Sequence, residues 1–230
     1  MNAFKLLMAA SCFLGLATSG VAKQDYSKSE GLLQYVDPYI GSGFHGHVFV
    51  GTSVPCGMVQ LGPNNIHKGW DWCSGYHYSD SILIGFSHTH LSGTGCIDLG
   101  DILFRPSLQT PLAFSHSDEK ASPGYYSVNL REAGVLAELT TTPHVGIHRY
   151  TYKKGIEATL VVDMDHLLDN EYIYEGWVKQ TGENELTGMR RTRGWVDNQY
   201  VFFVAQFSQP FSSMAVSYTH LRAHETDSYL

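Results

Sequence analysis

The chain has 230 residues, of which 43% are hydrophobic and 13% aromatic, and its 15 Lys and Arg against 22 Asp and Glu give a formal net charge of −7. This composition supports a sizeable hydrophobic core and excludes a disordered or low-complexity chain. The acidic balance disfavours a nucleic-acid partner, because binding to phosphates needs a basic face. The 23 glycines and the many Tyr and Phe favour a turn-rich β-structure over long helices.

The first 22 residues have the organisation of a secretory signal peptide. Lys5 supplies the positive start, residues 6–17 form an apolar run, and residues 20–22 are small, as signal peptidase requires. The apolar run is shorter than the roughly 20 residues that a membrane anchor would need. We therefore expect residues 1–22 to be removed, leaving an exported chain without a transmembrane segment.

Eight segments of the remaining chain have the β-branched or aromatic character of strands, and Gly, Pro, Asn or Asp separate them. No window keeps a helical period of 3.6 residues. We predict an all-β fold, an antiparallel β-sandwich that forms one domain over residues 23–211. The expected strands are residues 81–86, 101–104, 125–130, 135–142, 145–152, 158–164, 172–178 and 200–207.

The end of the chain differs in character from the rest. Hydrophobic alternation stops after Phe211, and residues 217–226 resemble translated read-through of a sequencing adapter. We predict that residues 212–230 are a non-native tail and that the natural protein continues past Phe211. An ordinary polar terminus is the alternative.

Three cysteines, Cys56, Cys73 and Cys96, remain after the expected removal of the signal peptide. In an oxidising compartment an odd number allows at most one disulfide and leaves one thiol free. The sequence leaves the choice of the pair open.

Two His-x-His pairs, His45 with His47 and His88 with His90, are the sharpest pattern in the first half. In a strand, residues i and i+2 share a face and could direct two imidazoles at one metal ion. A zinc site needs three or four ligands, however, and no His-Glu-x-x-His or Cys-x-x-Cys motif completes the set. We therefore favour histidines hydrogen-bonded to the backbone and predict no metal ligand in this chain. A small metalloenzyme built on both pairs is the alternative.

The segment 69–80 gathers aromatic and acidic side chains. Aromatic faces beside a carboxylate suit a sugar, because the ring covers the apolar C–H face and the carboxylate accepts from hydroxyls. Even spacing equally suits one face of a buried strand, formed by Trp70, Trp72, Tyr76 and Tyr78. The carboxylates at positions 71, 80, 98 and 101 could include an acid/base pair, although turn chemistry is the more frequent role in Gly-rich segments.

Four ordered blocks carry a resemblance to a known family: VDPYIGSGFHGH at 36–47, GTSVPCGMVQL at 51–61, GWDWCSGYHYSD at 69–80 and GFSHTHLSGTG at 85–95. Together they resemble the N-terminal domain of glycoside hydrolase family 92, over about residues 35–211. The resemblance implies an exported, mostly bacterial, exo-acting α-mannosidase that is calcium-dependent and inverts configuration. It implies a mannose-containing glycan as substrate, with α-1,2 linkages favoured, and a periplasmic or cell-surface location.

Members of this family join an N-terminal β-sandwich of the supersandwich type to a helical (α/α)6 domain, with the active site between them. The resemblance therefore implies that the general acid, the general base and the calcium ligands lie in the helical domain, beyond this chain. We predict no catalytic residue and no metal in the chain itself, which alone should hydrolyse nothing. A carbohydrate-binding sandwich without a hydrolytic role is the alternative function.

The resemblance also implies which residues of this chain meet substrate. By position, Gly51 presents its backbone to the mannose that is cleaved off, and Trp70 packs on the neighbouring, leaving-group sugar. The matching motifs place four more residues on the same rim, namely His45, His47, Asp71 and Cys73.

Two departures from the family pattern lie close to Gly51. Val50 stands where the family usually has Pro, and Cys56 stands where it usually has Phe. Both bear on the shape of the loop that would present Gly51.

Overall fold

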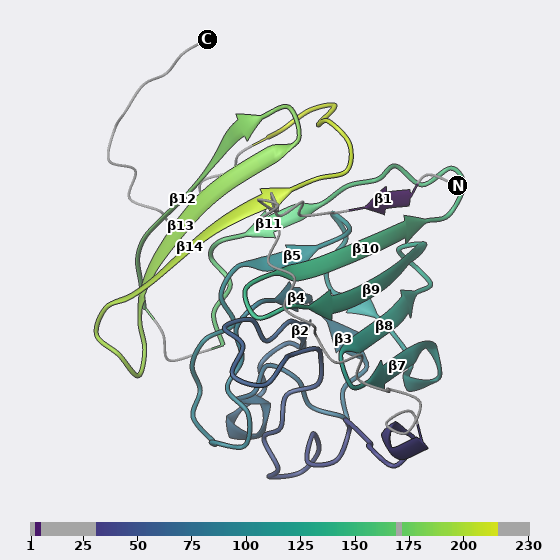
Figure 1. Cartoon of the computed structure of the whole chain (residues 1–230), viewed down its shortest axis with the longest axis vertical. Helices are drawn as coiled ribbons and strands as arrows, with labels where there is room; N and C mark the ends of the chain where they lie inside the picture. The colour runs from purple at the N-terminus through teal and green to yellow at the C-terminus, as the bar shows by residue number, and fades with distance from the viewer. Residues whose placement is uncertain (1–2, 6–30, 169–171, 216–230) are drawn as a thin grey trace, which may run out of the picture.

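The computed structural model describes residues 3–5, 31–168 and 172–215 (Figure 1). Within these ranges the regular structure consists of strands, two short 3-10 helices and one helical turn at residues 31–33, and every strand pairing is antiparallel. The predicted all-β antiparallel sandwich is therefore confirmed.

The strands form four sheets. The five-stranded sheet has the order β1 (Ala3–Lys5), β10 (Gly146–Tyr152), β9 (Val135–Thr141), β8 (Tyr125–Leu130) and β7 (Glu119–Ser122). The four-stranded sheet has the order β11 (Val161–Asp163), β5 (Leu103–Arg105), β4 (Gly85–Ser87) and β2 (Gly62–Asn64). The three-stranded sheet has the order β12 (Tyr172–Gly182), β13 (Glu185–Arg193) and β14 (Gln199–Gln206). A small pair joins β3 (Ile82–Leu83) to β6 (Leu112–Ala113), and the 3-10 helices are η1 (Trp70–Trp72) and η2 (His116–Asp118).

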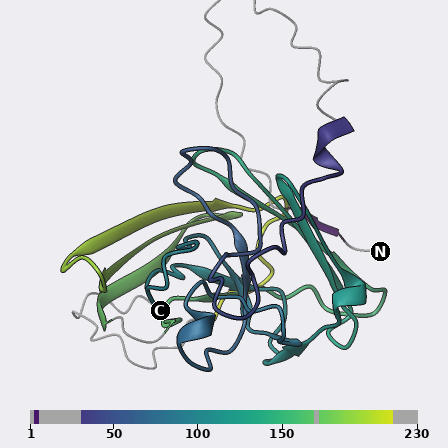
Figure 2. The ribbon, with the colours of Figure 1, turned by 90° about the horizontal axis from the view of Figure 1, so that it is seen from below.

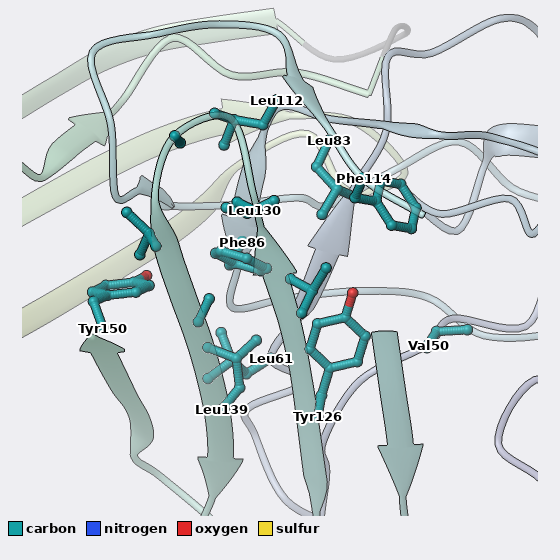
Figure 3. Packing of buried hydrophobic residues seen from close by; sticks show 14 of the residues in the cluster. Val50, Leu61, Leu83, Phe86, Leu112, Phe114, Tyr126, Leu130, Leu139 and Tyr150 are labelled. Atoms are coloured by element: carbon teal, nitrogen blue, oxygen red, sulfur yellow. The ribbon is translucent and has the colours of Figure 1, made fainter. Parts of the chain in front are cut away.

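The larger hydrophobic cluster lies against the inner face of the five-stranded sheet (Figure 3). In β9 the side chains of Val135, Ala137 and Leu139 alternate inward, as the two-residue period of a strand requires. They meet Phe86 of β4 and Leu61, both fully buried. Truncating a buried aromatic ring such as Phe86 to alanine would cost about 3–5 kcal/mol.

A second cluster packs the three-stranded sheet onto β5 and β11. Phe104 of β5 meets Leu186 of β13 and Ala205 of β14 there. Leu160 packs against both clusters and so links them. Consequently the three-stranded and five-stranded sheets lie on opposite sides of the domain, as Figure 2 shows from below.

Several predicted strand boundaries need correction. Residues 125–130 match β8, but residues 81–86 divide into β3 and β4, which belong to different sheets. The predicted strand 158–164 reduces to β11. Strands β2, β6, β7 and β13 were not predicted, because their sequences are short or carry Gly, Pro and charged residues.

The predicted signal peptide, residues 1–22, lies outside the described residues except for β1, whose backbone pairs with β10. The predicted tail lies outside them beyond residue 215. Within the described ranges, no helix has the length and apolarity that crossing a membrane demands.

A chain of neutral groups runs through the core beside β10. The Nδ1–H of His88 donates to the carbonyl of Ile102 at 2.7 Å, which leaves its Nε2 as an acceptor. The Nε2 of His148, 2.9 Å away, therefore donates to it, and the Nδ1 of His148 accepts from the Tyr150 hydroxyl at 2.7 Å. Each of these polar atoms is paired only while both imidazoles stay uncharged.

Burial holds several histidines in this neutral form. It lowers the pKa of His88 and of His90 to about 4, and burial followed by the charge of Arg190 lowers that of His166 to about 3. The pKa of His148 also falls well below its usual value, because the ring is buried and lies beside His88. Protonating any of these rings would place a charge in an apolar interior.

This arrangement predicts acid unfolding. The unfolded histidines regain a pKa near 6.5, so between about pH 6.5 and pH 4 the unfolded state binds more protons than the folded one. The free energy of unfolding should fall as pH falls through this window, by about 1.4 kcal/mol per pH unit for each buried histidine. Urea unfolding at pH 7.5, 6.5, 5.5 and 4.5 measures the slope.

The variant His144→Gln provides the control, since His144 is exposed on the turn between β9 and β10. It should keep the slope of the natural chain. Equal stability at pH 7.5 and pH 4.5 would contradict the neutral-histidine core.

Candidate functional site

One carboxylate oxygen joins the first His-x-His pair. The Oδ1 atom of Asp71 lies 2.7 Å from Nδ1 of His45 and 3.2 Å from Nε2 of His47, so both imidazoles donate to it. Hydrogen bonding to His45 lowers the pKa of Asp71, and that to His47 adds to the effect. His45 is exposed and His47 is buried, so the carboxylate joins the surface of the domain to its interior.

The same cluster fixes the ring of Trp70. The edge of His47 meets it at 4.2 Å between ring centroids, with His45 at 5.9 Å. The indole Nε1–H donates to the carbonyl of Gly95 at 2.6 Å. Although it is held at these points, Trp70 stays 55% exposed.

The loops behind this cluster are tightly coiled. Phe44 and His47 both have positive φ angles, of 50° and 56°. A Cβ added at Gly46 would lie 2.1 Å from the carbonyl oxygen of Gly41, so only glycine allows the chain to close on itself there. The backbone N–H of Gly93 donates to the carbonyl of His47 at 2.7 Å, which brings the following Gly-rich loop against the cluster.

Gly51 lies where two backbone segments approach closely. Its φ is +156°, and an added Cβ would meet the Leu61 carbonyl oxygen at 2.3 Å and the Gly62 Cα at 2.7 Å. Thr52 and Leu61 exchange backbone hydrogen bonds of 2.8 and 2.9 Å next to it. Val50, where the family pattern has Pro, is fully buried in the core, so the departure fills an interior position.

The cysteines differ in their surroundings. Cys73 is buried directly after η1, and burial raises the pKa of its thiol. Cys96 is partly buried and Cys56 is exposed, and all three thiols are free. The backbone N–H of Cys73 donates to the Trp70 carbonyl at 3.0 Å and closes η1, and the place of Cys73 on the substrate rim stays a prediction.

The evenly spaced aromatic residues do not form one face of a strand. Trp70 and Trp72 lie in η1, where Trp72 stacks on His77 at 4.3 Å between centroids. Tyr76 is buried and donates from its hydroxyl to Glu119 at 3.0 Å. Among these aromatic residues, Trp70 is the one whose ring lies against His45 and His47 of the Asp71 cluster in the described chain.

The other carboxylates of the sequence analysis are part of the framework. Asp80 accepts from the backbone N–H groups of residues 81 and 82 and from Lys68. Asp98 accepts from the N–H of Leu99 at 2.8 Å and of Trp195 at 2.7 Å. Asp101 is buried and accepts from Thr89 and Gln199. These contacts favour turn and framework chemistry over an acid/base pair.

The two His-x-His pairs lie in separate places. His90 donates from Nδ1 to the Gln60 carbonyl at 2.8 Å, and His88 to that of Ile102, both inside the domain. The backbone-bonded interpretation is thus correct for the second pair. Sequence reasoning did not anticipate the contribution of Gly95, although its block, 85–95, carries part of the resemblance.

The fold is a β-sandwich, and its loops place the exposed indole of Trp70 beside the carboxylate of Asp71, which accepts hydrogen bonds from two imidazoles. The family model described as the glycosyl hydrolase family 92 N-terminal domain matches residues 35–228, and so extends past Phe211. The chain therefore belongs to glycosyl hydrolase family 92, as its N-terminal domain.

Solved structures agree with this assignment. A family GH92 α-mannosidase from Bacteroides thetaiotaomicron, in complex with mannoimidazole, is 35% identical with a TM-score of 0.75, covering 79% of this chain and 26% of that one. A family GH92 inverting mannosidase from Bacteroides thetaiotaomicron VPI-5482 is 26% identical with a TM-score of 0.63, covering 77% and 25%.

A curated relative, an uncharacterized secreted glycosidase of Arthroderma benhamiae, is 30% identical over 179 residues, covering 68% of this chain and 22% of its own length. The chain thus spans about a quarter of the length of the relatives it matches.

The contacts of Asp71 predict a spectroscopic effect. In Asp71→Asn the charged acceptor for His45 and His47 is lost, so their rings should reorient against Trp70. The indole N–H resonance of Trp70, assigned with Trp70→Phe, should shift in a 15N-resolved NMR spectrum. Glu132→Gln, at an exposed carboxylate between β8 and β9, is the control and should shift nothing. An unmoved Trp70 resonance in Asp71→Asn would contradict the inference that Asp71 orients His45 and His47 against Trp70.

The close approach of two backbone segments at Gly51 predicts an effect on the free energy of unfolding. Gly51→Ala should lower the free energy of unfolding by at least about 2 kcal/mol, because overpacking adds to backbone strain. Gly69→Ala is the matched control, since Gly69 has φ +125° but nothing within 4 Å of an added Cβ. Urea unfolding should show the larger loss at Gly51, and equal losses would contradict the close approach.

Proposed function

We propose that the chain is the substrate-rim domain of an exported, calcium-dependent, inverting α-mannosidase that favours α-1,2-linked mannose. The bacterial periplasm or cell surface is the proposed location. Family membership supports the mannosidase assignment, and the names of the solved relatives supply the inverting reaction.

The exposed ring of Trp70, held in one orientation, is the observation that carries this proposal. An indole surface covers the apolar C–H face of a sugar and loses little entropy on binding when it is already fixed. Asp71 lies beside it with a second carboxylate oxygen that can accept from a sugar hydroxyl. In this proposal Trp70 contacts the leaving-group sugar, and the backbone at Gly51 contacts the mannose that is released.

Hydrolysis needs groups that this rim does not supply. Inversion requires a general acid and a general base whose carboxyls are about 6.5–9.5 Å apart, with a water between them. Asp71 is bound to two imidazoles, and the neighbouring aspartates, Asp80 and Asp98, bind backbone N–H groups. We therefore propose that the acid and the base belong to the helical domain of the longer enzyme.

We propose that the calcium ion also binds in the helical domain of the longer enzyme. Calcium takes six to eight oxygen ligands, whereas the one cluster of potential ligands among the described residues offers two imidazole nitrogens and a carboxylate. This donor set does not fit calcium, so no calcium-dependent step is assigned to the chain. A carbohydrate-binding sandwich without a hydrolytic role remains the second candidate, favoured by a rim around Trp70 that is formed within this chain.

Assays on two proteins distinguish these functions. A protein of the relatives' length that carries this chain at its N-terminus should release mannose from α-1,2-mannobiose, and a calcium chelator should abolish the release. The 230-residue chain should release none.

Trp70→Ala in the long protein should raise KM more than it lowers kcat, since the ring binds a sugar rather than the reacting atoms. Mannose release by the chain alone, or a long protein that binds mannobiose without cleaving it, would contradict the proposal.

A further inference from the structure

The Asp71 cluster has the donor atoms of a metal site. Nδ1 of His45, Nε2 of His47 and Oδ1 of Asp71 all lie within 4.8 Å of one another. In the described part of the chain this is the one group of three or more such residues that meets that spacing. Two imidazoles and one carboxylate are a donor set that zinc, copper and nickel accept.

The two distances from Asp71 are close to those of a coordination shell. In a tetrahedral site with metal–ligand bonds of about 2.0–2.1 Å, neighbouring donor atoms are about 3.3 Å apart. The 3.2 Å between His47 and Asp71 already fits this edge. The 2.7 Å between His45 and Asp71 must widen by about 0.6 Å to reach that tetrahedral spacing.

The difference in exposure between the three ligands suits this adjustment. His45 is 74% exposed on its side chain, so its ring can turn without disturbing the core. His47 is 5% exposed and lies against Trp70, while η1 holds the backbone of Asp71. Two ligands are thus preorganised, and the third closes from solvent, leaving a fourth position for water or a sugar hydroxyl.

We propose that His45, His47 and Asp71 form a binding site for one divalent transition-metal ion of the zinc and nickel class, beside Trp70. The hydrogen-bonded cluster is the metal-free form of the site. On binding, the ion replaces the two N–H···O contacts, and each neutral imidazole carries its proton on the ring nitrogen that does not bind the metal.

Sequence spacing could not reveal this site. A metal motif is recognised when its ligands follow one another at short intervals, whereas Asp71 lies 24 residues beyond His47. The prediction of no metal in this chain rested on the missing third ligand. The loop 41–48 and η1 bring that ligand into place through the fold.

The test uses the 230-residue chain without an affinity tag, and zinc or nickel chloride as the probe. After equilibrium dialysis against zinc, elemental analysis should find one ion per chain. Nickel should quench tryptophan fluorescence, because the ion would lie beside Trp70. His45→Ala and Asp71→Asn should each weaken zinc binding by about tenfold or more.

Two controls separate this site from other histidines. His144→Ala removes an exposed histidine elsewhere and should bind zinc as the natural chain does. The double variant His220→Ala/His224→Ala removes the pair near the C-terminus and should also bind normally. An unchanged thermal unfolding midpoint in His45→Ala shows that a loss of zinc is not a loss of fold.

No retained zinc, or binding that His45→Ala leaves unchanged, would overturn the proposal. Binding that disappears in the His220/His224 variant would overturn it as well. None of these measurements uses hydrolysis, so they can fail while the mannosidase assignment stands, and the reverse.

Discussion

The rim of this domain depends on one carboxylate oxygen. Asp71 Oδ1 holds His45 and His47 together, and His47 in turn makes a T-shaped ring contact with Trp70. Without a charged acceptor, two imidazole N–H groups would have to find partners in a loop whose backbone is already committed to its own turns. The exposed indole thus takes its orientation from a polar contact on one side and from the Gly95 carbonyl on the other.

Two pairs of histidines in the described chain have different chemical surroundings. His88 and His148 lie in the interior, where burial keeps them neutral and a tyrosine hydroxyl completes their hydrogen bonds. His45 is exposed and His47 is buried beside Trp70, and both donate to the carboxylate of Asp71. The same side chain thus stabilises the core of the sandwich in one place and binds a carboxylate beside Trp70 in another, because the charge of its partner differs.

Sequence reasoning predicted the fold class and the strongest strands because alternation of apolar residues, as in β8 and β9, follows from a one-sided core. It missed β13, a central strand whose Arg190 is fully buried and donates to the His166 carbonyl, since charged residues are normally exposed. The resemblance predicts which motifs form the rim. The meeting of Asp71 with His45 could not be predicted, because it arises from the folding of two separate loops.

We propose that the fixed ring of Trp70 receives a sugar. The most direct test of this proposal is a titration of the 15N-labelled chain with α-1,2-mannobiose, followed through the indole N–H resonances. The Trp70 resonance should move, while those of Trp177 in β12 and Trp195, which follows β13, should stay in place. A stationary Trp70 resonance, or movement of the Trp195 resonance instead, would contradict the proposal.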